Sequence, residues 1–260
     1  MVKSTGDKLV SMTAVVLGHA PLGLLALIFV PVPPAQAWPI LAASVVIHAS
    51  YQFCLILAYR LGDFTQVYPI ARGSGPAIVT LFTIFVMGVE LSASEILAIS
   101  LIVTGIFCLS LLRQSDGLRN PRAVAAALLT GCFIAGYSLL DGYGARITGS
   151  AVGFIAWMTV INSAVFAMMI GLLRPDALKR VFTEGRNTFL IGGSASVIAY
   201  VLVVWAMTQA PIAVVTALRE TSTVFALLIG VLFLKESLTA GKIFATLLTL
   251  SGVLLLRFGF

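Results

Sequence analysis

Nine apolar segments, most of them about 20 residues long, occupy almost the whole of this 260-residue chain. A helix needs about 20 apolar residues to cross the hydrocarbon core of a bilayer. Charged residues make up 10% of the chain, against about 25% of a typical soluble domain. We therefore expect an all-α polytopic membrane protein with spans at 9–30, 38–59, 65–88, 94–112, 123–143, 151–173, 188–208, 211–234 and 240–257.

Basic residues are concentrated in alternate connections between these segments. Cytoplasmic loops of membrane proteins are enriched in lysine and arginine, so this side is expected to face the cytoplasm. The N-terminus is then inside and the C-terminus outside, in a multi-pass protein that we expect in a bacterial inner membrane. The basic residues of the predicted cytoplasmic side are Lys3, Lys8, Arg60, Arg113, Arg119, Arg122, Arg174, Lys179, Arg180, Arg186, Lys235 and Lys242, and those of the opposite side are Arg146 and Arg257.

Two pairs of matching residues lie 147 positions apart and indicate an internal repeat. The pairs are Arg72 with Arg219 and Gly105 with Gly252. This offset matches the first four segments to the last four. A repeat of five helices has an odd number of crossings, so its two copies must be inverted across the membrane, which is a recurrent transporter architecture.

We predict one integral membrane domain built from these two repeats. The first repeat covers residues 1–113, and the second, an inverted five-helix repeat, covers 123–260. The segment 123–143 has no counterpart upstream. The first repeat is therefore expected to lack its first helix.

Several short motifs carry a family resemblance. Pro-Ile-Ala-Arg at 69–72 is followed by Gly-Val-Glu-Leu-Ser at 88–92, with a second copy, Leu-Lys-Glu-Ser-Leu-Thr, at 234–239. Ala-Gly-Tyr-Ser-Leu-Leu-Asp at 135–141 is similar to the opening helix of a repeat. At these positions, and over nearly its whole length, the chain resembles the EamA-type members of the drug/metabolite transporter superfamily. The resemblance implies ten helices in two inverted halves, a central cavity and export of small metabolites.

Arg72 and Arg219 are candidate substrate-binding residues. A charged side chain near the middle of a bilayer is costly and usually has a functional or structural reason. Arg219 lies eight residues after Pro211, roughly 12 Å along a helix axis. Either guanidinium can bind a carboxylate or a phosphate of the substrate. The alternative is a structural ion pair with Asp141 or Glu220 that holds helices together.

Glu220 and Asp141 are acidic residues that we place within predicted spans. A carboxylate in a low-dielectric cavity can take up a proton, so either residue could couple transport to protons. Neutralisation of Arg72 or Arg219 is the simpler role for both. Asp141 also lies near the end of its segment, where it could be merely interfacial.

Prolines and glycines are expected to interrupt the third span. Proline removes an intrahelical hydrogen bond, and glycine permits close approach of backbones. A broken helix at membrane depth suits a cavity wall, although an ordinary kink with close helix packing is the alternative. The predicted hinge residues are Pro69, Gly73, Gly75 and Pro76 in this span, with Pro211 before the eighth.

Several polar or aromatic residues at membrane depth complete the predicted site. They could hydrogen-bond to a substrate or stack on it, and hydrogen bonding between helices is the alternative for each. They are His48, Tyr51, Gln52, Tyr137, Ser138, Trp157, Asn162 and Tyr200.

The predicted function is secondary transport of a small polar or amphipathic metabolite by alternating access, in the direction of export. An organic-phosphate or nucleotide-sugar exchanger is an alternative, and so is a non-transporting membrane subunit. No cluster of histidine, cysteine, serine or acidic residues has the spacing of an enzyme or metal site, so we expect neither catalysis nor a cofactor. The expected partners are the substrate and the bilayer rather than nucleic acid, in a monomer or a homodimer.

Overall fold

A computed structural model describes residues 7–62, 64–112, 120–222, 224–225 and 239–258. Within these ranges the regular structure is helical and contains no strand. The chain divides into two compact units, which are described separately. Unit 1 comprises residues 1–56 and 136–209, and unit 2 comprises 57–135 and 210–260. Each unit therefore combines segments of both predicted repeats.

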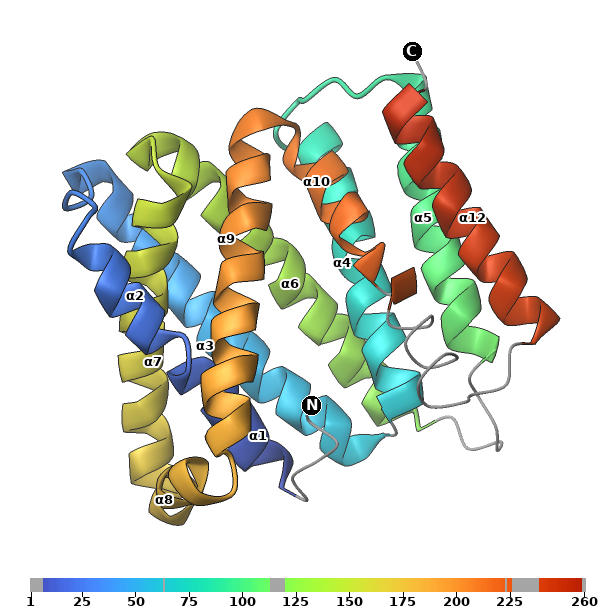
Figure 1. Ribbon diagram of the computed structural model, residues 1–260. Helices are drawn as coiled ribbons and strands as arrows, with labels where there is room; N and C mark the ends of the chain where they lie inside the picture. The colour runs from blue at the N-terminus through green and yellow to red at the C-terminus, as the bar shows by residue number, and fades with distance from the viewer. Residues whose placement is uncertain (1–6, 63, 113–119, 223, 226–238, 259–260) are drawn as a thin grey trace. The chain divides into compact units, whose positions relative to one another are not determined.

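Unit 1 contains the first helices of each predicted repeat (Figure 1). Its core is a cluster of buried apolar side chains that includes Val10, Phe166 and Val181. Its elements are α1 (Lys8–Leu17), α2 (Ala20–Leu27), the short 3-10 helix η1 (Ala35–Ala37), α3 (Trp38–Leu61) as far as residue 56, α6 (Pro121–Thr148) from residue 136, α7 (Ala151–Leu173), α8 (Pro175–Thr183), the π-helix η2 (Thr188–Gly193) and α9 (Ser194–Gln209).

The first predicted span is divided into α1 and α2 by a break at Gly18 and His19. Gly18 lies against η2, where a Cβ atom on Gly18 would come within 2.1 Å of the Phe189 carbonyl oxygen. Gly193 takes part in the same contact, because a Cβ there would lie 2.5 Å from the Cα of Gly18. The two glycines allow the backbones to touch, which a continuous hydropathy profile cannot reveal.

Unit 2 contains α4 (Phe64–Phe85), α5 (Ala93–Leu112), α10 (Ile212–Arg219) and α12 (Ala240–Phe258), with the remaining parts of α3 and α6. Figure 1 shows α5 and α12 side by side. Gly105 of α5 lies against Ala245 and Thr249, whereas Gly252 of α12 lies against Ala98 and Ile102.

These glycine contacts are symmetric under the 147-residue offset, because Ala98 matches Ala245 and Ile102 matches Thr249. Such reciprocal contacts are typical of an interface around a two-fold axis. The partner number falls as the residue number rises, so the two helices are antiparallel. This pairing supports an inverted repeat, whereas the boundaries at 1–113 and 123–260 stay a prediction.

The all-α membrane fold predicted from hydropathy is confirmed. Three further apolar helices, α4, α5 and α12, correspond to predicted spans, with shorter apolar stretches at Ile70–Phe85, Ala93–Cys108 and Ala240–Leu256. Most of the predicted span at 211–234 lies outside the described residues, apart from α10 and the turn that follows it. Among the described residues, five stretches are long and apolar enough to cross a membrane, namely Lys8–Leu27, Ala35–Leu61, Pro121–Thr148, Ala151–Leu173 and Thr188–Gln209.

The predicted interruption of the third span is wrong. Helix α4 runs without a break through Pro69 and residues 73–76. Its glycines serve close packing instead, since Gly73 lies against Ile106 and Phe107 and Gly75 lies against Ile134. Small residues allow helices to approach closely in a bilayer, and transmembrane helices tolerate proline. A hinge role for Pro69, Gly73, Gly75 and Pro76 stays a prediction.

Pro211 immediately precedes α10, and the division between the two units falls two residues earlier, after Gln209. It is therefore not a kink within a helix. The other divisions between the units lie inside α3 and inside α6. Hinge motion at Pro211 stays a prediction.

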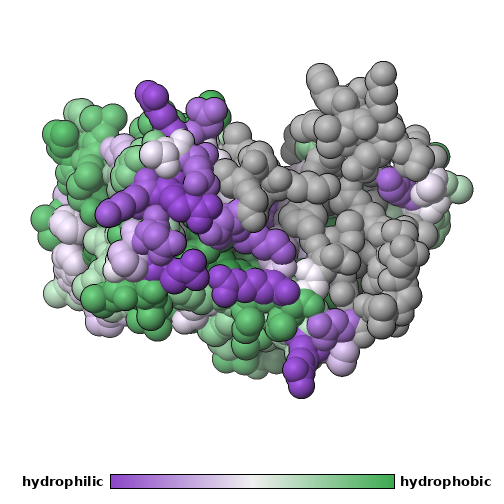
Figure 2. Space-filling model, turned by 90° about the horizontal axis from the view of Figure 1, so that it is seen from below, coloured by the Kyte–Doolittle hydropathy of each residue, from purple (hydrophilic) through white to green (hydrophobic). Residues whose placement is uncertain are grey.

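Hydrophilic residues gather on the face of unit 1 where α1 begins and α8 lies (Figure 2). Arg180 of α8 donates hydrogen bonds to Asp7 at 2.8 Å and to Glu184 at 2.9 and 2.8 Å. Asp7 also caps α1 by accepting a hydrogen bond from the Leu9 amide at 3.0 Å. Burial alone would raise the pKa of Asp7, but these hydrogen bonds outweigh it and hold that pKa below its ordinary value.

We expect acid to weaken this contact between α1 and α8. A carboxyl group whose pKa is lowered by folding stabilises the protein above its ordinary pKa, and this contribution is lost as the pH falls through the folded pKa. The ordinary value is 3.8 for Asp7. The melting temperature in detergent should therefore be lower below pH 3.8 than at pH 7 in the wild type. This difference should be smaller in Asp7→Asn. Asparagine preserves the cap, so an equal loss in both proteins would contradict the prediction.

Candidate functional site

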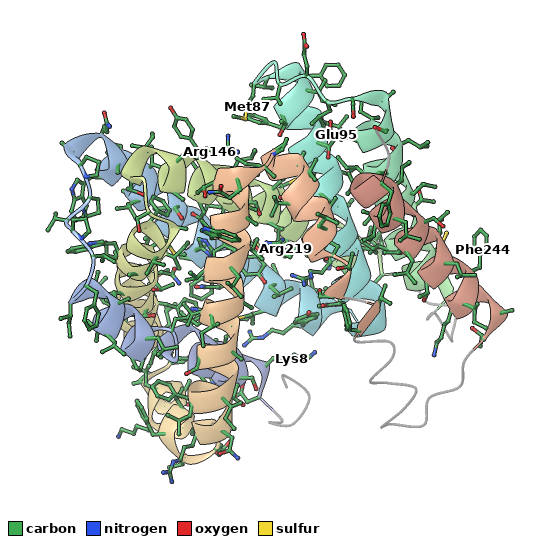
Figure 3. The ribbon with its side chains drawn as sticks, turned by 45° about the horizontal axis from the view of Figure 1, so that its top comes forward. Lys8, Met87, Glu95, Arg146, Arg219 and Phe244 are labelled. Carbon is green, nitrogen blue, oxygen red and sulfur yellow. The ribbon has the colours of Figure 1, made fainter. Side chains whose placement is uncertain are left out.

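In unit 2, the two predicted arginines converge on one carboxylate. The Arg72 Nε lies 3.2 Å from Oε2 of Glu220, and the Arg219 Nε donates to its Oε1 at 3.3 Å. Glu220 is fully buried, whereas the side chains of Arg72 and Arg219 are 24% and 10% exposed. Figure 3 shows Arg219 at the end of α10. The predicted pairing of the arginines with Glu220 is therefore present.

Local backbone structure explains how Glu220 reaches both guanidinium groups. Helix α10 ends at Arg219, and the amides of Glu220 and Thr221 donate to carbonyls three residues earlier, at 3.1 and 3.0 Å. This tighter turn is a common way to finish a helix. Glu220 occupies the position that corresponds to Gly73 in the first repeat, within the continuous helix α4. A single carboxylate therefore pairs with two arginines that lie at equivalent positions of the two repeats.

Two further side chains contact Arg72. Its guanidinium carbon lies 5.6 Å from the centre of the Tyr68 ring, within the range of a cation–π contact. Its Nη2 donates to the Ser222 hydroxyl at 3.5 Å. We define Tyr68, Arg72, Arg219, Glu220 and Ser222 as the arginine cluster. Its mixture of cationic and hydroxyl groups can bind an oxyanion.

In unit 1, a second cluster surrounds Asp141. Asp141 accepts hydrogen bonds from His48 Nε2 at 2.8 Å, from the Tyr200 hydroxyl at 2.5 Å, and from the Ser44 hydroxyl. The carboxylate is fully buried. Its donors come from α3 and α9, and it stands on α6, so three helices build this site.

Aromatic rings enclose the same position. The imidazole of His48 stacks on Tyr137 with a centroid distance of 4.3 Å. Tyr51 meets Tyr137 edge-on at 5.3 Å, and Tyr200 meets it edge-on at 5.9 Å. We define Ser44, His48, Tyr51, Tyr137, Asp141 and Tyr200 as the Asp141 cluster.

The Asp141 cluster corrects the expectation that Asp141 pairs with an arginine. Its carboxylate is fully buried and bonded on both oxygens, and its depth in the membrane stays a prediction. Among the described residues its hydrogen bonds come from Ser44, His48 and Tyr200 rather than from an arginine. The sequence prediction also missed Ser44. The helical spacing of Ser44, His48 and Tyr51, which places them on one face, is the signal that could have identified it.

Trp157 and Asn162 both lie on α7 of unit 1. Trp157 meets Trp38 edge-on at 5.3 Å, and Asn162 is 2% exposed. The Trp157 Nε1 and the Asn162 Oδ1 are buried without a hydrogen-bond partner among the described residues. A role in substrate binding stays a prediction for both.

Comparison with known proteins identifies the family. The profile of the EamA-like transporter family matches residues 121–258, which is more than half of the chain. The chain belongs to the EamA-like transporter family. This EamA-like protein is therefore a multi-pass membrane transporter of the drug/metabolite type, as its motifs predicted. No curated protein matches the chain.

A solved structure, described only as the crystal structure of a protein, shares the fold of this EamA-like transporter. The two chains are 17% identical with a TM-score of 0.80, and the match covers 98% of this chain and 91% of the other. At this identity the similarity establishes the fold alone. Within the described residues of the EamA-like transporter, no group of three histidine, cysteine or acidic residues could hold a metal ion.

Proposed function

We propose that this protein exports a small polar or amphipathic metabolite from the cytoplasm across a bacterial inner membrane by alternating access. The observation that supports this most directly is the convergence of Arg72 and Arg219 on the buried Glu220. Charged residues at membrane depth commonly mark a substrate or ion pathway. In a family of transporters, such a cluster is the natural place for a polar group of the substrate.

The arginine cluster can bind an anionic group by exchanging partners. Each guanidinium carries several N–H donors and can bind a carboxylate or a phosphate through two of them. A substrate anion would compete with Glu220 for the same donors. Binding would then loosen the contact between α4 and α10, and this coupling gives the substrate a direct effect on the packing of two helices.

An organic-phosphate or nucleotide-sugar exchanger is the second candidate. Two arginines that face one carboxylate favour it, because paired arginines suit the geometry and charge of a phosphate. Proton coupling through Glu220 or Asp141 belongs to the same proposal. Both are fully buried carboxylates, and a proton on either would remove its charge.

The experiment replaces Arg72 or Arg219 with alanine. Each single variant leaves Glu220 one cationic partner, so the protein should still fold. Loss of a charge-assisted hydrogen bond worth about 1.5–3 kcal/mol should lower transport of an anionic substrate by about 10- to 100-fold. The measurement uses proteoliposomes loaded with a defined mixture of amino acids, organic acids, organic phosphates and nucleosides, with export followed by mass spectrometry.

Arg174→Ala is the matched control, because Arg174 is 54% exposed and pairs with the exposed Asp176. It should transport like the wild type. Selective loss of organic phosphates in the Arg72 and Arg219 variants would favour the exchanger. Repeating the assay with an imposed pH gradient tests proton coupling. Variants that transport normally, or that lose activity only because they fail to fold, would contradict a substrate role and favour a structural ion pair.

A further inference from the structure

We propose that the Asp141 cluster binds a positively charged amine of the substrate. The inference rests on the proposed transport function and adds a substrate class to it. It concerns unit 1 alone and is independent of the arginine cluster. The argument starts from the charge of Asp141 and from the rings around it.

Asp141 is a buried carboxylate that accepts three side-chain hydrogen bonds. The hydroxyls of Ser44 and Tyr200 donate to it, and so does Nε2 of His48. Hydrogen bonds to an ionised carboxylate stabilise its charged form. A carboxylate in a buried, low-dielectric position attracts a cation strongly.

The surrounding rings add a second attraction for a cation. The face of an aromatic ring is electron-rich and attracts ammonium groups, and cages of such rings recognise quaternary ammonium ligands. Tyr137 stands one helical turn before Asp141 on α6, so both side chains lie on one face of that helix. Tyr51 of α3 and Tyr200 of α9 contact Tyr137 edge-on and bring their rings to the same position.

Burial increases from the outer rings toward the carboxylate. Tyr51 and Tyr200 are partly exposed, His48 and Tyr137 are 9% and 5% exposed, and Asp141 is fully buried. A ligand would thus meet aromatic faces first and the carboxylate last. An anion would be repelled by both features, so this composition selects an amine rather than a carboxylate or phosphate.

The experiment measures equilibrium binding of radiolabelled choline to the purified full-length protein. Choline is a quaternary amine with a fixed charge, and 3,3-dimethylbutan-1-ol is its neutral isostere. We expect unlabelled choline to displace the label and the neutral isostere to compete at least about tenfold more weakly. Asp141→Asn should weaken choline binding at least about tenfold. Asp176→Asn, at an exposed aspartate of α8, should leave it unchanged.

Tyr137 provides a second pair of variants in case Asp141→Asn does not fold. Tyr137→Phe keeps the ring and should retain choline binding within about threefold, whereas Tyr137→Leu removes the ring and should abolish most of it. Equal competition by the neutral isostere, or equal binding in the phenylalanine and leucine variants, would overturn the amine site. Failure of the proposed transport function would appear separately, as the absence of export by the wild type in proteoliposomes.

Discussion

Glu220→Ala is expected to lower the free energy of unfolding by about 3–5 kcal/mol. The substitution removes the carboxylate that lies 3.2 and 3.3 Å from the two guanidinium groups. Breaking a buried ion pair from one side leaves an uncompensated charge, which is more costly than replacing the whole pair. Here it would leave the positively charged guanidinium groups of Arg72 and Arg219 on either side of the position that the carboxylate had occupied. Unfolding titration with sodium dodecyl sulfate measures the change.

The more buried arginine provides an internal check on this prediction. Removing Arg219 as well should make the double variant Arg219→Ala/Glu220→Ala more stable than Glu220→Ala, because one stranded charge disappears. Glu90→Ala is the control, since Glu90 is exposed, and it should stay within about 0.5 kcal/mol of the wild type. A Glu220→Ala protein as stable as this control would rule out an energetically important ion pair.

Gly105→Ala and Gly252→Ala should each destabilise the protein by about 1–3 kcal/mol. A Cβ at Gly105 would lie 2.3 Å from the Thr249 hydroxyl and 2.8 Å from the Ala245 carbonyl oxygen. A Cβ at Gly252 would lie 2.6 Å from the Ala98 carbonyl oxygen. Because backbone atoms lie against both Cβ positions, α5 and α12 must move apart. The resulting loss of unfolding free energy is measured by the same titration with sodium dodecyl sulfate.

The two glycines face one helix pair, so their effects should be coupled. Once one alanine has separated α5 from α12, the second alanine causes a smaller steric clash. The double variant should therefore lose less unfolding free energy than the sum of the two single variants. Gly171→Ala is the control, because its nearest neighbour is the flexible end of Leu178 at 3.3 Å and alanine favours a helix. Additive losses, or losses equal to the control, would contradict a shared close contact.

Hydropathy predicted most helices of this protein with small errors at their ends. The segment 151–173 coincides with α7, and 188–208 differs by one residue from the end of α9. These segments are predictable because a bilayer requires a long apolar stretch with its backbone hydrogen-bonded internally. The place of a helix break was less predictable. It was expected at Pro69 to Pro76, yet breaks occur at Gly18 and after Arg219.

The break at Gly18 lies just before Pro21, in the first turn of α2, and it packs against η2, about 170 residues later in the chain. Conversely, the glycines of α4 have packing partners in α5 and α6, which keep the helix continuous. Proline and glycine allow a break without requiring one. Tertiary contacts decide which of the two occurs.

The sequence alone determined that this chain is a helical membrane protein and marked Arg72, Arg219, Glu220 and Asp141 as exceptional, because charge at membrane depth is costly wherever it occurs. Only the tertiary structure decided how those charges are shared. In that structure both arginines pair with Glu220, whereas Asp141 is hydrogen-bonded to His48, Ser44 and Tyr200. A buried charge must find its partner in space, and the partners of Asp141 lie between 59 and 97 residues away along the chain.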